Sequence, residues 1–252
     1  MTETLENARD EALRLMGAAQ EEGVGLRLIG GLAVKLRCPS ASHRSLERKY
    51  PDVDFVTDRR GSIALPAFLS RMGYTPNKTF NTLSGDRRQL YYDLERERQI
   101  DIFVGNFAMC HKIPLEERLR VDPFTIPLAE LFSTKAQIVQ INQKDVLDLY
   151  ALVLDHEVGP SDVNDQINAG RIAELCAKDW GLYTTIGITM DLLEERLLAS
   201  SLTSEEQERM RGRLAALRMT MEDAPKTTAW KLRAKVGKKV RWYELPEEVQ
   251  RG

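Results

Sequence analysis

The stretch KYPDVDFVTDRRG, from Lys49 to Gly61, decides the fold because it places two carboxylates one residue apart in an apolar run. Asp52 and Asp54 flank Val53, and Phe55 follows directly. Side chains alternate along a strand, so the two acids would share one face while Val53 and Phe55 share the other. We therefore expect a strand that is anchored by its apolar face and presents two like charges on its other face.

The segments around this strand predict a small mixed sheet. LRLIGG (26–31) is a short apolar run ending in two glycines, and LAVKLR (32–37) after it begins a helix. SIALPAFLSRMGY (62–74) predicts a helix, as does the amphipathic segment over residues 3–22. QLYYDLE (89–95) and QIDIFVG (99–105) flank a charged turn, which is typical of a hairpin.

After Pro127 the pattern becomes helical. Helices are expected over 128–141, 144–157, 165–178, 181–199 and 204–221. The predicted fold class is therefore α/β, with a small mixed-sheet core followed by a mostly helical C-terminal domain. Three parts are expected: a core over 1–126, a helical domain over 127–225 and a basic, aromatic tail over 226–252.

Composition excludes several classes of protein. The 252 residues are 42% hydrophobic and 29% charged, which is typical of a soluble globular chain, and the net charge is only −2. The three cysteines are too few and too far apart for a disulfide framework. The charged N-terminus lacks the apolar core of a signal peptide, and no apolar run approaches the ~18 residues of a membrane span. We expect a cytoplasmic protein with no membrane partner.

A third acid has the same context as the first two. Asp101 lies between Ile100 and Ile102, in the second strand of the expected hairpin. If that strand pairs beside the first, Asp101 converges on Asp52 and Asp54. Clustered carboxylates repel one another unless a cation joins them, and Mg²⁺ or Mn²⁺ suits oxygen ligands. Three carboxylates on adjacent strands suit two-metal phosphoryl transfer, whereas the alternative is a solvated face of an edge strand.

The glycine pair Gly30-Gly31 suggests a phosphate-binding turn. Glycine between a strand and a helix lets backbone N–H groups approach a phosphate, and the helix N-terminus favours the negative charge. The alternative is an ordinary tight turn. Neither the G-x-G-x-x-G spacing of a dinucleotide site nor the G-K-[ST] of a P-loop is present.

LIGGLAVKL (28–36), DVDFV (52–56) and IDIFV (100–104), in this order, resemble the nucleotidyltransferase superfamily with the DNA polymerase β-like fold. The resemblance implies metal-dependent transfer of a nucleoside monophosphate from an NTP to a hydroxyl acceptor, with release of pyrophosphate. It assigns the metals to Asp52, Asp54 and Asp101, and Asp101 would also act as the base or orient the acceptor hydroxyl. Gly30 and Gly31 would cradle phosphates, although many members carry serine where Gly31 stands.

A second resemblance lies in LAELFSTKAQIVQINQKDVLDLYALV (128–153), which is similar to the AbiEii-like, toxin-related branch. It implies that Lys135 contacts nucleotide phosphates and that Asp145 and Asp148, after Lys144, support nucleotide binding. The i, i+3 spacing by itself puts the two acids on one helix face. The alternative is an amphipathic helix in which both acids are solvated. The branch further implies a cognate antitoxin and an acceptor that is RNA such as tRNA, a protein or a small molecule.

Two basic segments have open interpretations. Arg44, Arg48 and Lys49 lie in RCPSASHRSLERKY (37–50), an insertion relative to the compact motif, and would contact triphosphate or acceptor unless they form a solvated loop. The stretch 226–241 carries seven Lys or Arg and no acid, with Trp230 inside it and Trp242 after it. It would bind RNA by phosphate contact and stacking, or pack as a basic tail.

Two other kinds of site or function are compatible with parts of the sequence. Cys38, His43, Cys110 and His111 are an alternative zinc set that the pattern disfavours, because neither cysteine belongs to a C-x-x-C pair and adjacent Cys110-His111 is an awkward chelate. A non-catalytic nucleotidyltransferase-like module that binds nucleotide or a partner protein is the alternative function.

Overall fold

The computed structural model describes residues 3–43 and 45–245, which form two compact units. Unit 1 contains Met1–Arg37, Lys49–Phe107 and Pro114–Pro127. Unit 2 contains Cys38–Arg48, Ala108–Ile113 and Leu128–Gly252. The predicted fold class is confirmed, because a small mixed sheet is followed by a mostly helical C-terminal region. The finer three-part division of the chain stays a prediction.

Unit 1 is built on a five-stranded sheet with the strand order β1-β2-β5-β4-β3. β2 runs parallel to β5, and the other neighbours are antiparallel. The predicted hairpin is confirmed as the pair β4–β5. The bounds are β1 (Leu26–Ile29), β2 (Val53–Thr57), β3 (Thr75–Pro76), β4 (Arg88–Asp93) and β5 (Arg98–Val104).

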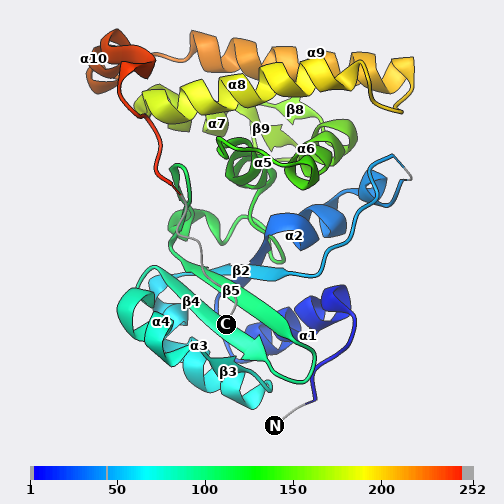
Figure 1. Cartoon of the computed structure of the whole chain (residues 1–252), viewed down its shortest axis with the longest axis vertical. Helices are drawn as coiled ribbons and strands as arrows, with labels where there is room; N and C mark the ends of the chain where they lie inside the picture. The colour runs from blue at the N-terminus through cyan, green and yellow to red at the C-terminus, as the bar shows by residue number, and fades with distance from the viewer. Residues whose placement is uncertain (1–2, 44, 246–252) are drawn as a thin grey trace. The chain divides into compact units, whose positions relative to one another are not determined.

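Helices cover both faces of this sheet. Figure 1 shows α1 and α3 on one side of the sheet and α2 on the other. The bounds are α1 (Ala8–Glu21), α2 (Gly30–Arg37), α3 (Arg59–Arg71), α4 (Lys78–Ser84) and the 3₁₀ turn η2 (Glu116–Arg118). α1 begins five residues later than predicted because the side chain of Asn7 caps it, accepting from the backbone N–H groups of Arg9 and Asp10.

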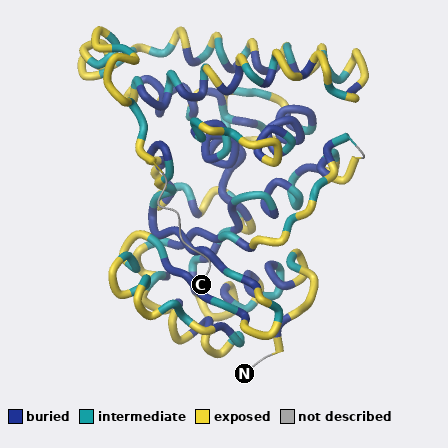
Figure 2. The backbone as a smooth tube through the Cα atoms, viewed as in Figure 1, coloured by how far each residue is buried: buried dark blue, intermediate teal, exposed yellow. Residues whose placement is uncertain are grey.

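The alternation that was expected for the strand after Tyr50 is present in β2. Val53 and Phe55 are fully buried, and Figure 2 shows the central strands as the most buried part of unit 1. Burial of each such side chain contributes about 1.5–3 kcal/mol, which holds the strand in one register. Asp58, the third acid in the alternation, caps α3 by accepting from the backbone N–H of Gly61 at 2.6 Å. Its role is therefore structural.

Unit 2 is a helical bundle. Figure 1 shows α8 and α9 side by side along α5, α6 and α7, and α5 is buried over nearly its whole length. The bounds are α5 (Leu128–Ala136), α6 (Gln143–Asp155), α7 (Ala169–Lys178), α8 (Trp180–Leu197), α9 (Ser204–Asp223) and α10 (Thr228–Val236). Shorter elements are η1 (Pro39–Ser42), β8 (Val158–Gly159), β9 (Ile167–Asn168) and η3 (Gly237–Lys239). β6 (Asn106–Ala108) and β7 (Lys112–Pro114) lie where the chain passes between the units.

Two differences from the sequence pattern stand out in unit 2. α5 ends at Ala136, five residues before the predicted end, and Asn142 caps the next helix with its side-chain oxygen. α10 was not predicted, because no apolar stripe marks it; Thr227 caps its start. No helix within the described ranges has the length and hydropathy that a bilayer crossing requires.

His111 is a buried titratable residue of unit 2 whose protonation makes the free energy of unfolding depend on pH. Its ring is buried, and its Nε2 lies 2.8 Å from the hydroxyl oxygen of Thr185. Burial lowers the pKa of His111, and the nearby charges of Asp179 and Glu244 only partly oppose the effect. The unfolded chain therefore binds a proton more readily than the folded chain below the ordinary histidine pKa of about 6.5.

We expect acidification through about pH 6.5 to lower the free energy of unfolding, with a contribution from His111 that is absent in a His111→Gln variant. Urea unfolding of both proteins at several pH values between about 5 and 8 measures the difference in slope. The exposed His43 offers a matched control, His43→Gln. Identical slopes for wild type and His111→Gln would contradict the assignment.

Candidate functional site

The structure brings Asp54 and Asp101 together. β2 and β5 are parallel neighbours, and their register pairs Asp54 directly with Asp101. Paired residues on neighbouring strands point to the same face, about 4.8 Å apart along the hydrogen-bonding direction. Asp54 is half-buried, and Asp101 is only 7% exposed. The predicted convergence of these two acids is confirmed, and the alternative of a fully solvated Asp101 is wrong.

Asp52 has a different position from the one expected. β2 begins at Val53, so Asp52 lies just before the strand, and it is exposed. Its charge still acts on the site, because it is one of the groups that raise the pKa of Asp101, after burial. Asp52 is therefore a carboxylate at the edge of the Asp54–Asp101 pair.

Arg88 forms an ion pair with the carboxylate of Asp101. Its Nε lies 2.7 Å from Oδ1 of Asp101, and its Nη2 donates to Oδ2, so the pair is bidentate. In the β4–β5 register Leu90 faces Asp101, and Arg88 is the diagonal neighbour two residues away on the same face. The guanidinium also lies 5.1 Å from the ring centroid of Phe103. Burial raises the pKa of Asp101, and the Arg88 hydrogen bonds oppose this rise.

Sequence reasoning missed Arg88. The signal was available in the hairpin, because the diagonal rule assigns a long side chain at this position to the face of Asp101. Using this rule requires the exact strand register. Hydrophobic alternation fixes which face a side chain is on, but a shift of the register by two residues keeps the same alternation.

Gly30 is the point where the β1–α2 turn meets Asp54. Its φ is +73°, a left-handed conformation that favours glycine, and a Cβ at this position would lie 2.5 Å from Oδ2 of Asp54. Gly31, the second residue of α2, does not have a positive φ. The left-handed backbone and the contact with Asp54 show why glycine stands at this turn, and phosphate binding by the turn stays a prediction.

A Gly30→Ala substitution should destabilise unit 1 by about 1–2 kcal/mol through the left-handed backbone alone, with a further cost from the clash with Asp54. Chemical denaturation measures the loss. Gly31→Ala is the matched control, because alanine in helical backbone is favourable, and it should leave stability unchanged or raised. Equal effects of the two substitutions would count against the observed turn.

A divalent metal fits part of this arrangement. Asp54 and Asp101 supply hard oxygen ligands from one face, and the missing side chain of Gly30 lets the carboxylate of Asp54 lie directly against the β1–α2 turn. However, no group of three or more His, Cys, Asp or Glu side chains in residues 3–43 and 45–245 is gathered so that it could hold a metal ion. Arg88 already supplies a positive charge to Asp101. The donor chemistry therefore fits Mg²⁺ once Asp101 is released from Arg88.

The second set of predicted residues forms a buried charge network in unit 2. Nζ of Lys135, in the last turn of α5, lies 2.8 Å from Oδ1 of Asp145 and 2.9 Å from Oδ2 of Asp148. Arg48 makes two contacts to Asp148, with Nε at 2.7 Å and Nη2 at 2.6 Å. Asp148 is fully buried, so the alternative that these acids lie in water is wrong.

The network explains where the inserted segment goes. Arg48 is anchored to α6 through Asp148, and the backbone N–H of Ser40 adds a hydrogen bond to Asp155 of the same helix at 2.8 Å. Burial alone would lower the pKa of Lys135, but the two carboxylates outweigh burial and raise it. Lys135 is thus a fully charged ammonium already bound by two acids, and its contact with nucleotide phosphates stays a prediction.

Of the other basic residues singled out in the sequence, some lie in the described part of the chain and some outside it. Lys49 is exposed in unit 1, Lys144 is exposed in unit 2, and Arg44 lies outside the described residues, as do 246–252 of the predicted tail. The aromatic residues of the tail pack against unit 2: Trp230 lies edge-on to Tyr183, and Trp242 lies edge-on to Trp180.

Comparison with known proteins adds no assignment. No family model matches the chain, and the search of curated proteins finds no match.

Proposed function

We propose that the protein is a metal-dependent nucleotidyltransferase that transfers a nucleoside monophosphate from an NTP to a hydroxyl acceptor and releases pyrophosphate. The observation that carries this proposal is the register pair Asp54–Asp101, with the left-handed Gly30 against Asp54. Asp52, Asp54 and Asp101 would hold Mg²⁺ or Mn²⁺, which would supply positive charge to the triphosphate oxygens and to the leaving pyrophosphate.

The residues of unit 1 have separate tasks in this reaction. The acceptor oxygen forms a bond to the α-phosphorus, and the bond to the oxygen bridging the α- and β-phosphates breaks. Asp101 takes the acceptor proton or orients the hydroxyl, which requires that Arg88 first leave its carboxylate. The backbone of Gly30 and Gly31, at the N-terminus of α2, donates to phosphate oxygens.

A second candidate is a non-catalytic nucleotide-binding or protein-interaction module. The observation that favours it is the bidentate Arg88–Asp101 pair, since a carboxylate neutralised in this way is satisfied without any metal. Under this candidate Asp54 and Gly30 would still accommodate nucleotide, but no transfer would follow.

One assay separates the two candidates. The full chain is incubated with each α-labelled NTP, Mg²⁺ or Mn²⁺, and in turn total tRNA, a protein extract and an aminoglycoside. Label that moves to one acceptor only with metal supports the transferase. Thermal stabilisation by NTP and Mg²⁺ without transfer to any acceptor supports the module. The absence of both transfer and stabilisation would refute both candidates.

The motif resemblance also supports proposals about partners and location. A cognate antitoxin and a cytoplasmic location belong to these proposals, and co-purification from the native host tests the first of them. An RNA acceptor has additional support from the charge distribution at the C-terminal end of unit 2.

A further inference from the structure

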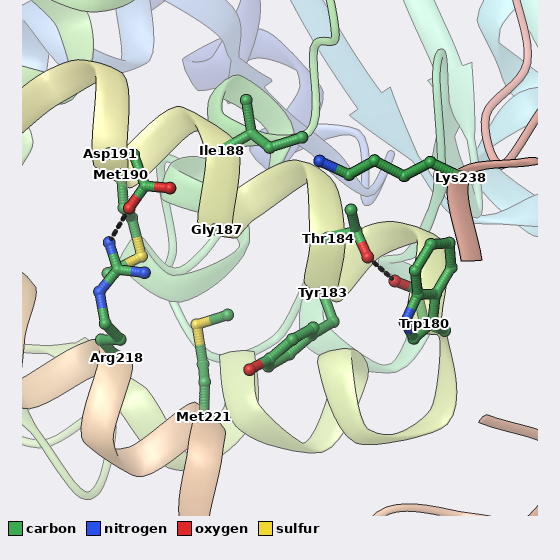
Figure 3. Close-up of a pocket in the computed structure, with 10 residues that line it drawn as sticks. All are labelled: Trp180, Tyr183, Thr184, Gly187, Ile188, Met190, Asp191, Arg218, Met221 and Lys238. Atoms are coloured by element: carbon green, nitrogen blue, oxygen red, sulfur yellow. Dashed lines mark hydrogen bonds and ion pairs between the residues drawn. The ribbon is translucent and has the colours of Figure 1, made fainter. Parts of the chain in front are cut away.

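Unit 2 contains a pocket that no step of the proposed transfer uses. It lies on α8 and is bordered by α9 and η3, with a volume of about 290 Å³ (Figure 3). Its walls include Trp180, Tyr183, Asp191, Arg218 and Lys238. This volume is at the lower end of small-molecule sites, so it suits one ring system rather than a polymer.

Gly187 forms the floor of this pocket. It is in the middle of α8, where glycine destabilises a helix relative to alanine. A Cβ at this position would meet no atom within 4 Å, so the missing side chain leaves open space and is not required by packing. In Figure 3, Gly187 lies at the centre of the residues that surround the pocket.

The walls combine aromatic and polar groups. Trp180 and Tyr183 provide ring surface on one side. On the other side Asp191 accepts a hydrogen bond from Nη2 of Arg218 at 2.7 Å, which places an acceptor and a donor together. Rings combined with paired donors and acceptors match the faces and edges of a nucleobase.

A basic stretch of the chain reaches the pocket through Lys238. The stretch 226–241 holds seven of the 36 Lys and Arg residues and none of the 38 Asp and Glu residues. Two of these cations are used internally: Lys226 donates to the carbonyls that end α9, and Arg233 donates to the carbonyls of Gly237 and Val240.

Five cations of this stretch face solvent. In the part of the chain that the structure describes, none of them forms an ion pair with an acid; they are Lys231, Lys235, Lys238, Lys239 and Arg241. One of them, Lys238, extends across the pocket in Figure 3. Concentrated positive charge without acidic partners, on a chain of net charge −2, is complementary to a polyanion.

We propose that this pocket and these cations form a binding site for single-stranded RNA, in which one unpaired base enters the pocket over Gly187 and the neighbouring phosphates contact Lys235, Lys238 and Lys239. This inference deepens the proposed function, on which it rests for the statement that RNA is the acceptor. A duplex would not fit, because the base must leave its stack to reach the pocket.

Fluorescence anisotropy of the full chain with a labelled, unstructured RNA of about twelve nucleotides tests the site. Gly187→Leu fills the pocket and should weaken binding roughly ten-fold, the loss of about one base contact. Gly212→Leu is the matched control, because Gly212 is also mid-helix with no atom within 4 Å of its Cβ, and it should bind as wild type. Circular dichroism of both variants verifies that α8 and α9 remain folded.

The charge contribution is measured separately. Replacing Lys235, Lys238 and Lys239 by Ala should reduce the slope of log K against log salt by about 2, since each phosphate contact on a single strand contributes roughly 0.7. Lys144→Ala, an exposed lysine on another helix, should leave the slope unchanged.

Several outcomes would overturn the site. Equal affinity for a duplex of the same length, full binding by Gly187→Leu, or binding to anionic lipid vesicles but not to RNA each refutes it. Asp54→Asn should bind RNA as wild type while it loses transfer. RNA binding that is lost in Gly187→Leu, from a wild-type chain that transfers no label to RNA, places the failure in the proposed function and leaves this site standing. Transfer to RNA with no binding loss in Gly187→Leu places the failure in this pocket alone.

Discussion

Asp54→Asn should lower nucleotide transfer by at least about 10²-fold while leaving unit 1 folded. Asparagine keeps the shape of the side chain, so the register with Asp101 and the fit against Gly30 are retained. The substitution removes the charge, and a single preorganised electrostatic group is typically responsible for 10²–10³-fold in rate. Transfer of α-label to the acceptor is the measurement, with circular dichroism and thermal unfolding of the same sample.

Asp58→Asn is the matched control for this prediction. Asp58 belongs to the same alternation along the chain, but its side chain caps α3, and asparagine is an equally good cap. The control should therefore retain both stability and transfer. A fully active Asp54→Asn would refute the proposed mechanism, and an inactive Asp58→Asn would show that the assay responds to the strand rather than to the site.

Asp148→Ala should cost about 3–5 kcal/mol of unfolding free energy, the largest stability effect expected for a single residue here. Asp148 is fully buried and accepts from both Arg48 and Lys135. Its removal takes the carboxylate away from two cations that are only 11% and 13% exposed, and Asp145 remains paired with Lys135. Urea unfolding measures the loss of free energy. The loss should be larger for the unfolding of unit 2, which contains Asp148, than for the unfolding of unit 1.

An exposed ion pair provides the comparison. Glu208→Ala removes the partner of Arg211 in α9, where the glutamate side chain is 80% exposed, and should change stability by less than about 1 kcal/mol. A joint Arg48→Leu and Asp148→Leu variant should recover part of the loss, because it removes one charge of each sign. A cost for Asp148→Ala as small as that for Glu208→Ala would show that the network is solvated.

The parts of the fold that could be predicted are those with a local cause. Period-two alternation identified β2 and β5, and the charged turn between two alternating runs identified the β4–β5 hairpin. The pairing of Asp54 with Asp101 was predicted because each is an acid in an apolar strand. The end of α5, the start of α1 and the presence of α10 were not predicted, since capping side chains and packing decide helix limits.

The partners of the acids could not be predicted from local pattern. Arg88 reaches Asp101 through strand register, and Arg48 reaches Asp148 across 100 residues of chain. From the sequence, Arg48 was expected to contact triphosphate or acceptor or to lie in a solvated loop, and Arg88 was not singled out. Contacts of this kind depend on which segments the fold brings together, and neither composition nor periodicity carries that information.

The sequence by itself determined the class of fold, the strand that bears Asp54 and its apolar anchors, and the segregation of positive charge into residues 226–241. These features follow from side-chain alternation and composition, which are properties of neighbouring residues. Only the tertiary structure decided that Asp52 lies outside the strand, that Arg88 holds Asp101, that Lys135 is bound by two buried acids, and that Lys238 of this stretch borders a glycine-floored pocket. These depend on burial and on distant segments, because the energy of a charge is set by the groups that surround it after folding.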